Sequence, residues 1–547
     1  MQNKETKFRF LLSLILGFVG ILLVNYFHQL NHTDVIKNLQ EPITPIFVIP
    51  GLPFPVLLLF GLGFGVLGWI ITSRQFSQKF VGEATAESLG AIRIITCTTA
   101  FITTIWLENI STSALLPQEM RRPMGVIDLF YNIPGFETFV VNQTSLQIFE
   151  WLTALVLFLG IIGLQTRFFV PLGAFCYLLL GGILRHKIYF FHPGLTVTYV
   201  LILVAFTPCG DGLSVDRLWK VHKGESVPRS DLPLPIYGWS RYFCWTALGL
   251  AYFFAGLSKI RDGGLFWFDA TNMMGMLYKS ALDPMGFNFD ISLYLIDAPD
   301  IIFIIMGLMG SYAEIAFISV LFSRLSRKIM PIIMMSMHIG ILIFQNILFF
   351  DSICIQLIFF DFTKIKQSIG KWLRFNNIQE NSNLSASENT ALMSASTIHF
   401  RTFKYSLMVC ILTTIMLFSW LYRIEMYPLT SWQMFAGKNT SGIIKYSKVL
   451  ATYESGITES INIEKVIPVL FSSKSRSLLR QCFSKNIDKL RVCEILFESA
   501  GNFYNSKPQN TNKITKFEIQ QWKWNFISEP YDSNYGEMIK NHILSLK

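Results

Sequence analysis

The chain has 547 residues, of which 52% are hydrophobic and only 15% are charged. Soluble domains carry about a quarter charged residues, so this composition excludes an ordinary soluble protein over most of the length. The formal net charge of +10 does not indicate nucleic acid, because Lys and Arg lie in short segments between apolar runs and lack aromatic interleaving. We therefore expect an all-α polytopic transmembrane helix bundle.

Apolar runs long enough to cross a hydrocarbon layer predict ten or eleven transmembrane helices. They are residues 10–28, 50–72, 90–107, 147–164, 168–184, 189–208, 242–258, 300–323, 329–347, 349–362 and 403–422. The first run follows Lys4, Lys7 and Arg9 as in a signal peptide, but no small-residue cleavage site follows, so we interpret it as an uncleaved span. Residues 349–362 are barely long enough to cross, which leaves the two counts open.

The runs divide the chain into five parts. Residues 1–84 form a two-span extension, 85–375 a transmembrane core, 376–402 a low-complexity linker, 403–422 the last span and 423–547 an aqueous C-terminal domain. The linker is rich in Asn, Ser and Glu, a composition typical of disorder, and we expect it to be dispensable for folding.

The C-terminal domain is predicted to be a small α+β unit. Apolar and polar residues alternate at 443–452 and 460–470, which predicts strands, and a helical pattern follows at 474–498. Cys482 and Cys493 lie in this domain, and they would pair outside the cell and stay thiols inside. No cysteine or histidine spacing typical of zinc appears, so we predict no metal.

The distribution of Lys and Arg predicts the orientation. With the N-terminus in the cytoplasm, about 20 basic residues lie in inside segments and about 8 in outside loops, as the positive-inside rule requires. Eleven spans then place the C-terminal domain outside. The same topology puts Lys259 and His192 at the outer side.

Lys259 ends an apolar run in AYFFAGLSKIRDGG, residues 251–264. A lysine at a helix end in a membrane usually extends to the lipid headgroups, and this structural interpretation is preferred for a lone lysine. The alternative is a lysine in a desolvated pocket, where the neutral amine is favoured and acts as a base. The neighbouring Phe253 and Phe254 suit a flat aromatic ligand and strengthen the second interpretation.

Two histidines lie in similar surroundings. His192 follows Phe190 and Phe191 and precedes a proline that opens a helix, where a bond to a backbone carbonyl is the plainer interpretation. His338 lies inside the run 329–347, and a mid-span ionisable residue needs a partner, so a functional role and an interhelical hydrogen bond are equally favoured. Asn346 lies eight residues further on the same helix face.

Three other segments are interpreted as structural. Arg93 lies early in the third run and either anchors the cytoplasmic end or pairs with Asp211 or Asp216. These two carboxylates, in residues 207–218, would cap a following helix. Residues 427–437, YPLTSWQMFAG, suit an interfacial turn that docks the C-terminal domain.

The segments together resemble a known family. The matching features are the Arg93 span, the His192 helix followed by SVD (214–216), YFFAGLSK (252–259), the His338 helix, and SWQMF (431–435) after the last span. Their order is similar to the HTTM domain, the transmembrane module shared by vitamin K-dependent γ-carboxylases and many uncharacterised bacterial membrane proteins. The resemblance covers roughly residues 85–437, and YFFAGLSK is its most specific part.

The resemblance implies an enzyme that acts on a reduced quinone of the vitamin K hydroquinone type. Lys259 takes the place of the catalytic base and His192 that of its partner, while His338, Asn346 and Phe254 are expected to bind the cofactor. The family's reaction couples oxygenation of the hydroquinone to removal of a glutamate γ-proton and carboxylation, on the lumenal side. Membrane lipid and a secreted peptide or protein are the implied partners, and nucleic acid is not.

The chain departs from the animal carboxylases at several points. Phe191 stands where they have asparagine, Ser258 replaces the first of their paired lysines, and residues 423–547 are far shorter than their lumenal part. The quinone chemistry is therefore better supported than peptide carboxylation. Two other classes of function stay open, a transport, export or peptide-maturation component and a non-catalytic membrane scaffold.

Overall fold

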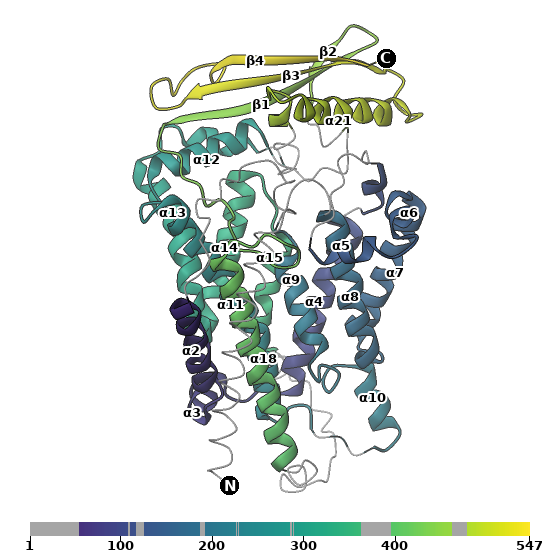
Figure 1. The fold of residues 1–547 in the computed structure, drawn as a ribbon, viewed down its shortest axis with the longest axis vertical. Coiled ribbons are helices and arrows are strands. Elements are labelled where there is room, and N and C mark those ends of the chain that lie inside the picture. The colour runs from purple at the N-terminus through teal and green to yellow at the C-terminus, as the bar shows by residue number, and fades with distance from the viewer. Residues whose placement is uncertain are drawn as a thin grey trace, which may run out of the picture.

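A computed structural model shows a helical bundle with a small sheet across one end (Figure 1). The structure describes residues 54–107, 110–115, 125–185, 192–225, 227, 229–284, 287, 289–362, 395–461, 466 and 479–546. The predicted span 10–28 and most of the predicted linker 376–402 lie outside these residues.

Among the described residues, seven helices are long and apolar enough to cross a membrane. They are α4 with η2 (Ala86–Ile102, Thr103–Leu107), α7 (Gln143–Ile162), α8 (Thr166–Arg185), α11 (Pro235–Gly263), α13 with η6 (Asp300–Ala316, Phe317–Leu321), α14 (Ser326–Gln345) and α18 (Ala395–Leu421). Each coincides with one of the predicted spans. These helices indicate an integral membrane protein.

Shorter elements fill the bundle and its ends. They are α2 (Phe54–Ile71), α3 (Arg74–Phe76), η1 (Ser77–Val81), η3 (Ser111–Leu115), α5 (Val126–Tyr131), α6 (Phe136–Val141), α9 (Leu195–Ala205), α10 (Val215–His222), α12 (Ala270–Leu282), η5 (Asp290–Leu295), α15 (Phe350–Cys354) and η7 (Ile355–Phe359). The predicted spans 189–208 and 349–362 thus appear as the short helix α9 and the short pair α15–η7. The sequence did not predict α12.

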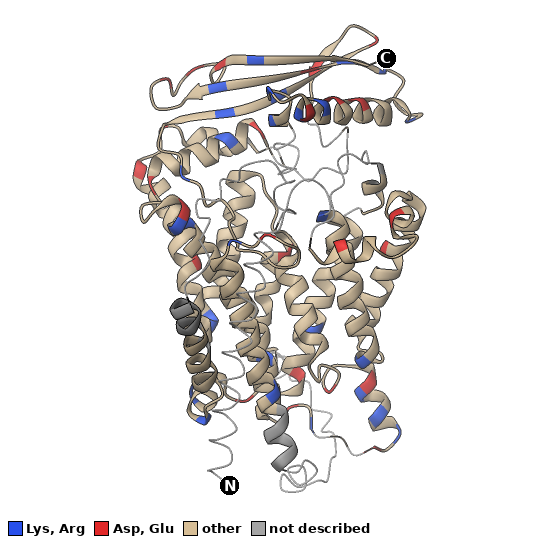
Figure 2. Cartoon of the chain, viewed as in Figure 1, with Lys and Arg blue, Asp and Glu red and all other residues tan. Residues whose placement is uncertain are grey.

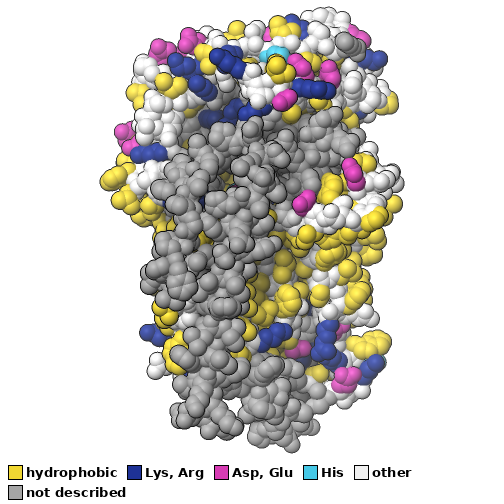
Figure 3. All heavy atoms as spheres, in the orientation of Figure 1, with side chains coloured by type: hydrophobic (Ala, Val, Ile, Leu, Met, Phe, Trp, Pro, Cys, Tyr) yellow, Lys and Arg dark blue, Asp and Glu magenta, His cyan; other side chains and the backbone are white. Residues whose placement is uncertain are grey.

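Charge separates the two ends of the bundle from its middle. Lys, Arg, Asp and Glu gather at both ends, and few lie between (Figure 2). On the face drawn in Figure 3, hydrophobic side chains cover the middle of the molecule to the right of the undescribed residues drawn in grey. Large apolar side chains of α7 that face outward, such as Trp151, Leu152 and Phe158, are about half exposed, as expected for contact with lipid.

Helix α11 is the centre of the bundle. Its apolar window is 83% buried, whereas those of α7, α13 and α14 are each 28% buried. Pro235 opens it at a position where no backbone N–H is needed. At Gly256, a Cβ atom would lie 2.7 Å from the carbonyl oxygen of Ser311, so only glycine permits this close approach of α13.

Arg93 fastens the end of the bundle opposite the sheet. It is fully buried and donates hydrogen bonds to the carbonyl oxygens of Cys209 (2.7 Å) and Leu213 (2.6 Å). Arg93 therefore bonds backbone carbonyls of the segment 207–218, the segment that contains its two considered partners, Asp211 and Asp216. Asp216 caps a helix, as predicted, but the capped helix is α8, through the backbone N–H of Thr166 (2.7 Å). The side chain of Ser214 caps α10.

The C-terminal domain is an antiparallel sheet with one helix. Strands β1 (Ile443–Tyr453), β2 (Thr458–Ser460), β3 (Ile514–Asn525) and β4 (Glu537–Ser545) lie in the order β2-β1-β3-β4, and α21 (Ile487–Asn505) packs on them. The first predicted strand is confirmed, the predicted helix lies further along the chain, and β3 and β4 were not predicted. Tyr446 and Trp524 pack with Tyr278 of α12, which docks the sheet on the bundle.

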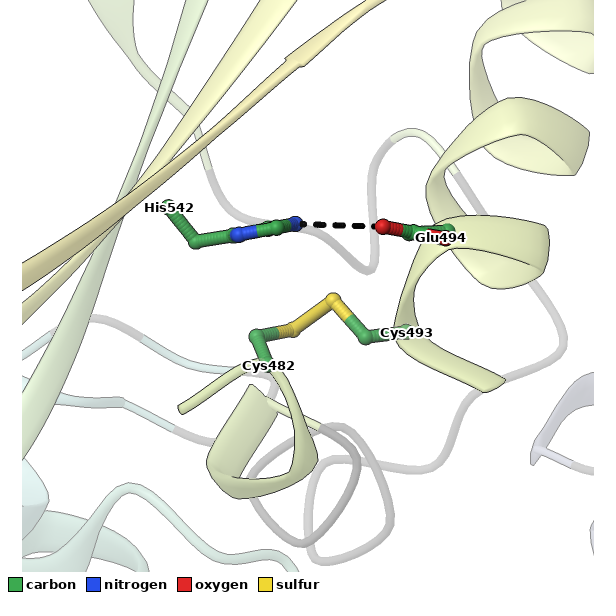
Figure 4. The surroundings of a disulfide bond; sticks show 4 residues. All are labelled: Cys482, Cys493, Glu494 and His542. Carbon is green, nitrogen blue, oxygen red and sulfur yellow. Dashed lines mark ion pairs between the residues drawn. A yellow bond between two sulfur atoms is a disulfide. The ribbon is translucent and has the colours of Figure 1, made fainter. Parts of the chain in front are cut away.

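A disulfide closes the C-terminal domain. Cys482 and Cys493 are bonded, with Cα atoms 5.1 Å apart, and the bond ties the residues before α21 to its first turns. Beside it, His542 of β4 faces Glu494 of α21 (Figure 4).

We expect Cys493→Ser to destabilise the C-terminal domain by about 3 kcal/mol. The bond closes a short loop and so restricts the unfolded chain, and without it the unfolded chain regains that conformational entropy. Limited proteolysis of the purified protein measures this as faster cleavage within the domain. The matched control is Cys410→Ser, a buried free cysteine in α18. Equal cleavage rates of Cys493→Ser and wild type would contradict the expectation.

Candidate functional site

Lys259 lies near the sheet-facing end of α11 and is 4% exposed. Its Nζ is 2.5 Å from Oε2 of Glu314 on α13 and 5.5 Å from the centre of the Trp267 ring. The lysine therefore does not extend to the surface. It is buried, as the functional interpretation required, but its charge is paired with a carboxylate that the sequence analysis did not single out.

Glu314 is buried near the C-terminal end of the apolar helix α13. It lies in the predicted span 300–323, as the only charged residue between Asp300 and Arg324. An ionisable residue inside a membrane span is a functional candidate by default, and this signal was available from the sequence. The close approach at Gly256, one turn before Lys259, brings α13 near enough for the pair to form.

The larger of two cavities beside this pair has a volume of about 240 Å³. Polar groups are few on its walls, namely Lys259, Glu314, Ser336, His338 and Gln345. The remaining wall is largely apolar, with aromatic rings and six methionines: Trp267, Phe344, Phe349, Phe435, Met273, Met276, Met306, Met309, Met337 and Met434. An apolar cavity with a few convergent polar groups is typical of a small-molecule site, and methionines adapt to irregular ligands.

The second cavity is smaller, with a volume of about 30 Å³. Its walls include His192, Thr196, Tyr252, Ser352 and Trp432. It shares four lining residues with the larger cavity, namely Glu314, His338, Phe349 and Met434. The structure thus brings Lys259 and His192 to two adjoining cavities rather than to a single one, at the end of the bundle that carries the sheet.

His338 lines both cavities and is 4% exposed. Its Nε2 lies 2.8 Å from the hydroxyl of Tyr252, which in turn accepts from the amide of Gln356 at 2.8 Å. The tyrosine hydroxyl has one proton, which it can donate to Nε2, and the imidazole then carries its own proton on Nδ1. Nδ1 is buried and has no hydrogen-bond partner among the described residues, so a ligand group is its natural complement.

His192 lies just before α9. Its Nε2 is 2.9 Å from Oγ1 of Thr430 and 3.8 Å from Oε2 of Glu425, and its ring lies 5.9 Å from that of Trp432. Burial, together with the positive charges of Arg185 and Lys259, lowers the pKa of His192 to about 3. The imidazole is therefore neutral at physiological pH.

Two residues predicted to bind the cofactor are engaged elsewhere. Asn346 ends α14 with a positive φ of 60°, accepts a 2.6 Å hydrogen bond from the N–H of Phe289 and donates to the carbonyl of Ser280 at 3.1 Å. Phe254 stacks on Trp420 at 5.6 Å. Phe190 and Phe191 lie outside the described residues.

Neither models of known protein families, nor curated proteins, nor solved structures match this chain. Within the described part of the chain, no three or more His, Cys, Asp or Glu side chains are grouped to hold a metal ion. The candidate site therefore rests on its own geometry.

We expect Lys259→Met and Glu314→Leu each to destabilise the protein by about 3–5 kcal/mol, because each leaves one buried charge without its partner. The double variant should be less destabilised than the sum of the two, since it leaves no charge unpaired. Thermal unfolding of the four proteins in one detergent measures the difference. Additive losses would show that the two groups do not interact.

Proposed function

We propose that the chain is an integral membrane enzyme of the HTTM type, similar to vitamin K-dependent γ-carboxylases, that acts on a reduced quinone at the outer membrane face. One observation carries the proposal. A buried Lys259–Glu314 pair and the unpartnered Nδ1 of His338 line the same apolar, methionine-rich cavity.

The chemistry begins with the ion pair. Proton transfer from Lys259 to Glu314, whose Oε2 lies 2.5 Å away, leaves an amine and a carboxylic acid. The amine is then a base for the hydroxyl of a bound hydroquinone. Its O–H bond breaks, the proton goes to Nζ, and the electron pair stays on the ring oxygen beside the new ammonium.

His338 and the cavity walls have separate tasks in this scheme. The Nδ1–H of His338 donates a hydrogen bond to a ring oxygen, which orients the ring. The methionines and aromatic residues of the larger cavity hold the flat ring and its apolar substituents and keep water away from the reacting oxygen. Carboxylation of a peptide is the part of the family's activity that this geometry supports least.

A transport component is the second candidate. The short helices α9 and α15 meet inside the bundle, where the N–H of Gly194 donates to a carboxylate oxygen of Asp351 at 2.9 Å. Helix ends that meet within the membrane are typical of transporters. Substrate-dependent flux in proteoliposomes without chemical conversion of the quinone would favour this candidate over the enzyme.

We expect Lys259→Ala to lower hydroquinone oxidation by about 10²- to 10⁴-fold, because a positioned base is lost. Lys259→Arg should not restore it, since the guanidinium keeps its proton. The assay is oxygen consumption with a reduced naphthoquinone in proteoliposomes, and Lys404→Ala, near the N-terminal end of α18, is the control. Activity close to wild type in Lys259→Ala would remove the enzyme proposal.

The outer placement of the site is part of the proposal, and the disulfide and the loop charges support it. Alkaline phosphatase fused after the last residue should be active, because that enzyme folds only in an oxidising compartment. A fluorescent cytoplasmic reporter at the same position should stay dark. The reverse pattern would place both the domain and the cavities on the cytoplasmic side.

A further inference from the structure

We propose that Glu425, acting through Thr430 and His192, is the exit by which protons leave the buried Lys259–Glu314 pair for the sheet-bearing face of the protein. The inference rests on the proposed function, since it concerns the fate of the proton removed from the hydroquinone. The sequence interpretation treated residues 427–437 as structural and did not consider Glu425.

Glu425 lies in the segment after α18, where it is held by three hydrogen bonds. Its Oε1 accepts from the backbone N–H of Ser431 at 3.1 Å and from its hydroxyl at 2.6 Å, and Oε2 accepts from the hydroxyl of Thr430 at 2.9 Å. The side chain is 25% exposed, so the carboxylate can exchange protons with water. Burial raises the pKa of Glu425, while the bonds from Ser431 and Thr430 and the charge of Arg261 counteract that rise.

The hydroxyl of Thr430 sets the direction of the next link. It accepts from the backbone N–H of Trp432 at 3.0 Å and gives its single proton to Glu425. Towards His192, 2.9 Å away, it can therefore only accept, so Nε2 of His192 carries the proton of the neutral imidazole. A proton that arrives at Nδ1 is matched by one that leaves Nε2 through Thr430 to Glu425.

The smaller cavity supplies the inner link. Glu314 and His192 both line its volume of about 30 Å³, which is large enough for about two water molecules. Tyr252 and Ser352, on its walls, offer hydroxyl partners for such water. The proton path then runs from Lys259 to Glu314, across this cavity to His192, and through Thr430 to Glu425. No other atom changes its bonding.

The following experiment distinguishes a proton relay through Glu425 from a purely structural role of the hydrogen bonds in its turn. Full-length protein in proteoliposomes is mixed with 1-naphthol, whose ionised form has its own absorbance, while a membrane-impermeant dye follows the pH outside. Wild type should ionise the naphthol and release a proton in the same phase. In Glu425→Gln and Thr430→Val, naphthol should still bind, but ionisation and proton release should slow by about 10²-fold.

Thr413→Val is the matched control, because it removes a hydroxyl from α18 that only bonds the preceding turn, and it should behave as wild type. Unchanged proton release in both test variants would overturn the relay and leave the proposed function standing. Loss of naphthol binding in both would show that the Glu425 turn is structural and would also overturn the relay. No naphtholate in wild type would overturn the proposed function and the relay with it.

Discussion

The close approach of α11 and α13 is the constraint on which the rest of the site depends. Because Gly256 has no side chain, the backbones of the two helices come close together, and Lys259 reaches Glu314 at 2.5 Å inside the bundle. A single buried charge would cost several kcal/mol, so neither residue could occupy this depth alone. Lys259 and Glu314 can line the cavities only because the charge of each one balances that of the other.

The two ends of the bundle satisfy a buried cation in different ways. Arg93 is held by carbonyl oxygens, which cannot take up its proton, and a guanidinium does not release one. It therefore fixes the packing of the segment 207–218 and supports no proton chemistry. Lys259 faces a carboxylate, with which it can exchange a proton, beside a cavity that admits a ligand. The candidate site therefore lies at the end of the bundle that carries the sheet.

The sequence predicted those features that depend on local composition or on a single residue type. Apolar runs located all seven long helices, and Lys259, His192 and His338 were singled out because ionisable groups are costly in membranes. It could not show that α13 would pack against α11, so Glu314 was missed although the same rule applied to it. Asn346 lies just after the last residue of α14 rather than on it, and the N–H of Phe289 donates to its side chain, which the periodicity of the sequence could not predict.

The segment between α18 and β1 joins the cavities to the C-terminal domain. Trp432 lines the smaller cavity, Phe435 the larger one, and Met434 both. Only a few residues later the chain enters β1, whose Tyr446 packs with α12, and α12 supplies further walls of the larger cavity. Because one short stretch forms the cavity wall and the domain anchor, docking of the sheet and the shape of the cavity are coupled. A ligand that displaces Met434 or Phe435 must therefore work against the packing that holds the domain in place.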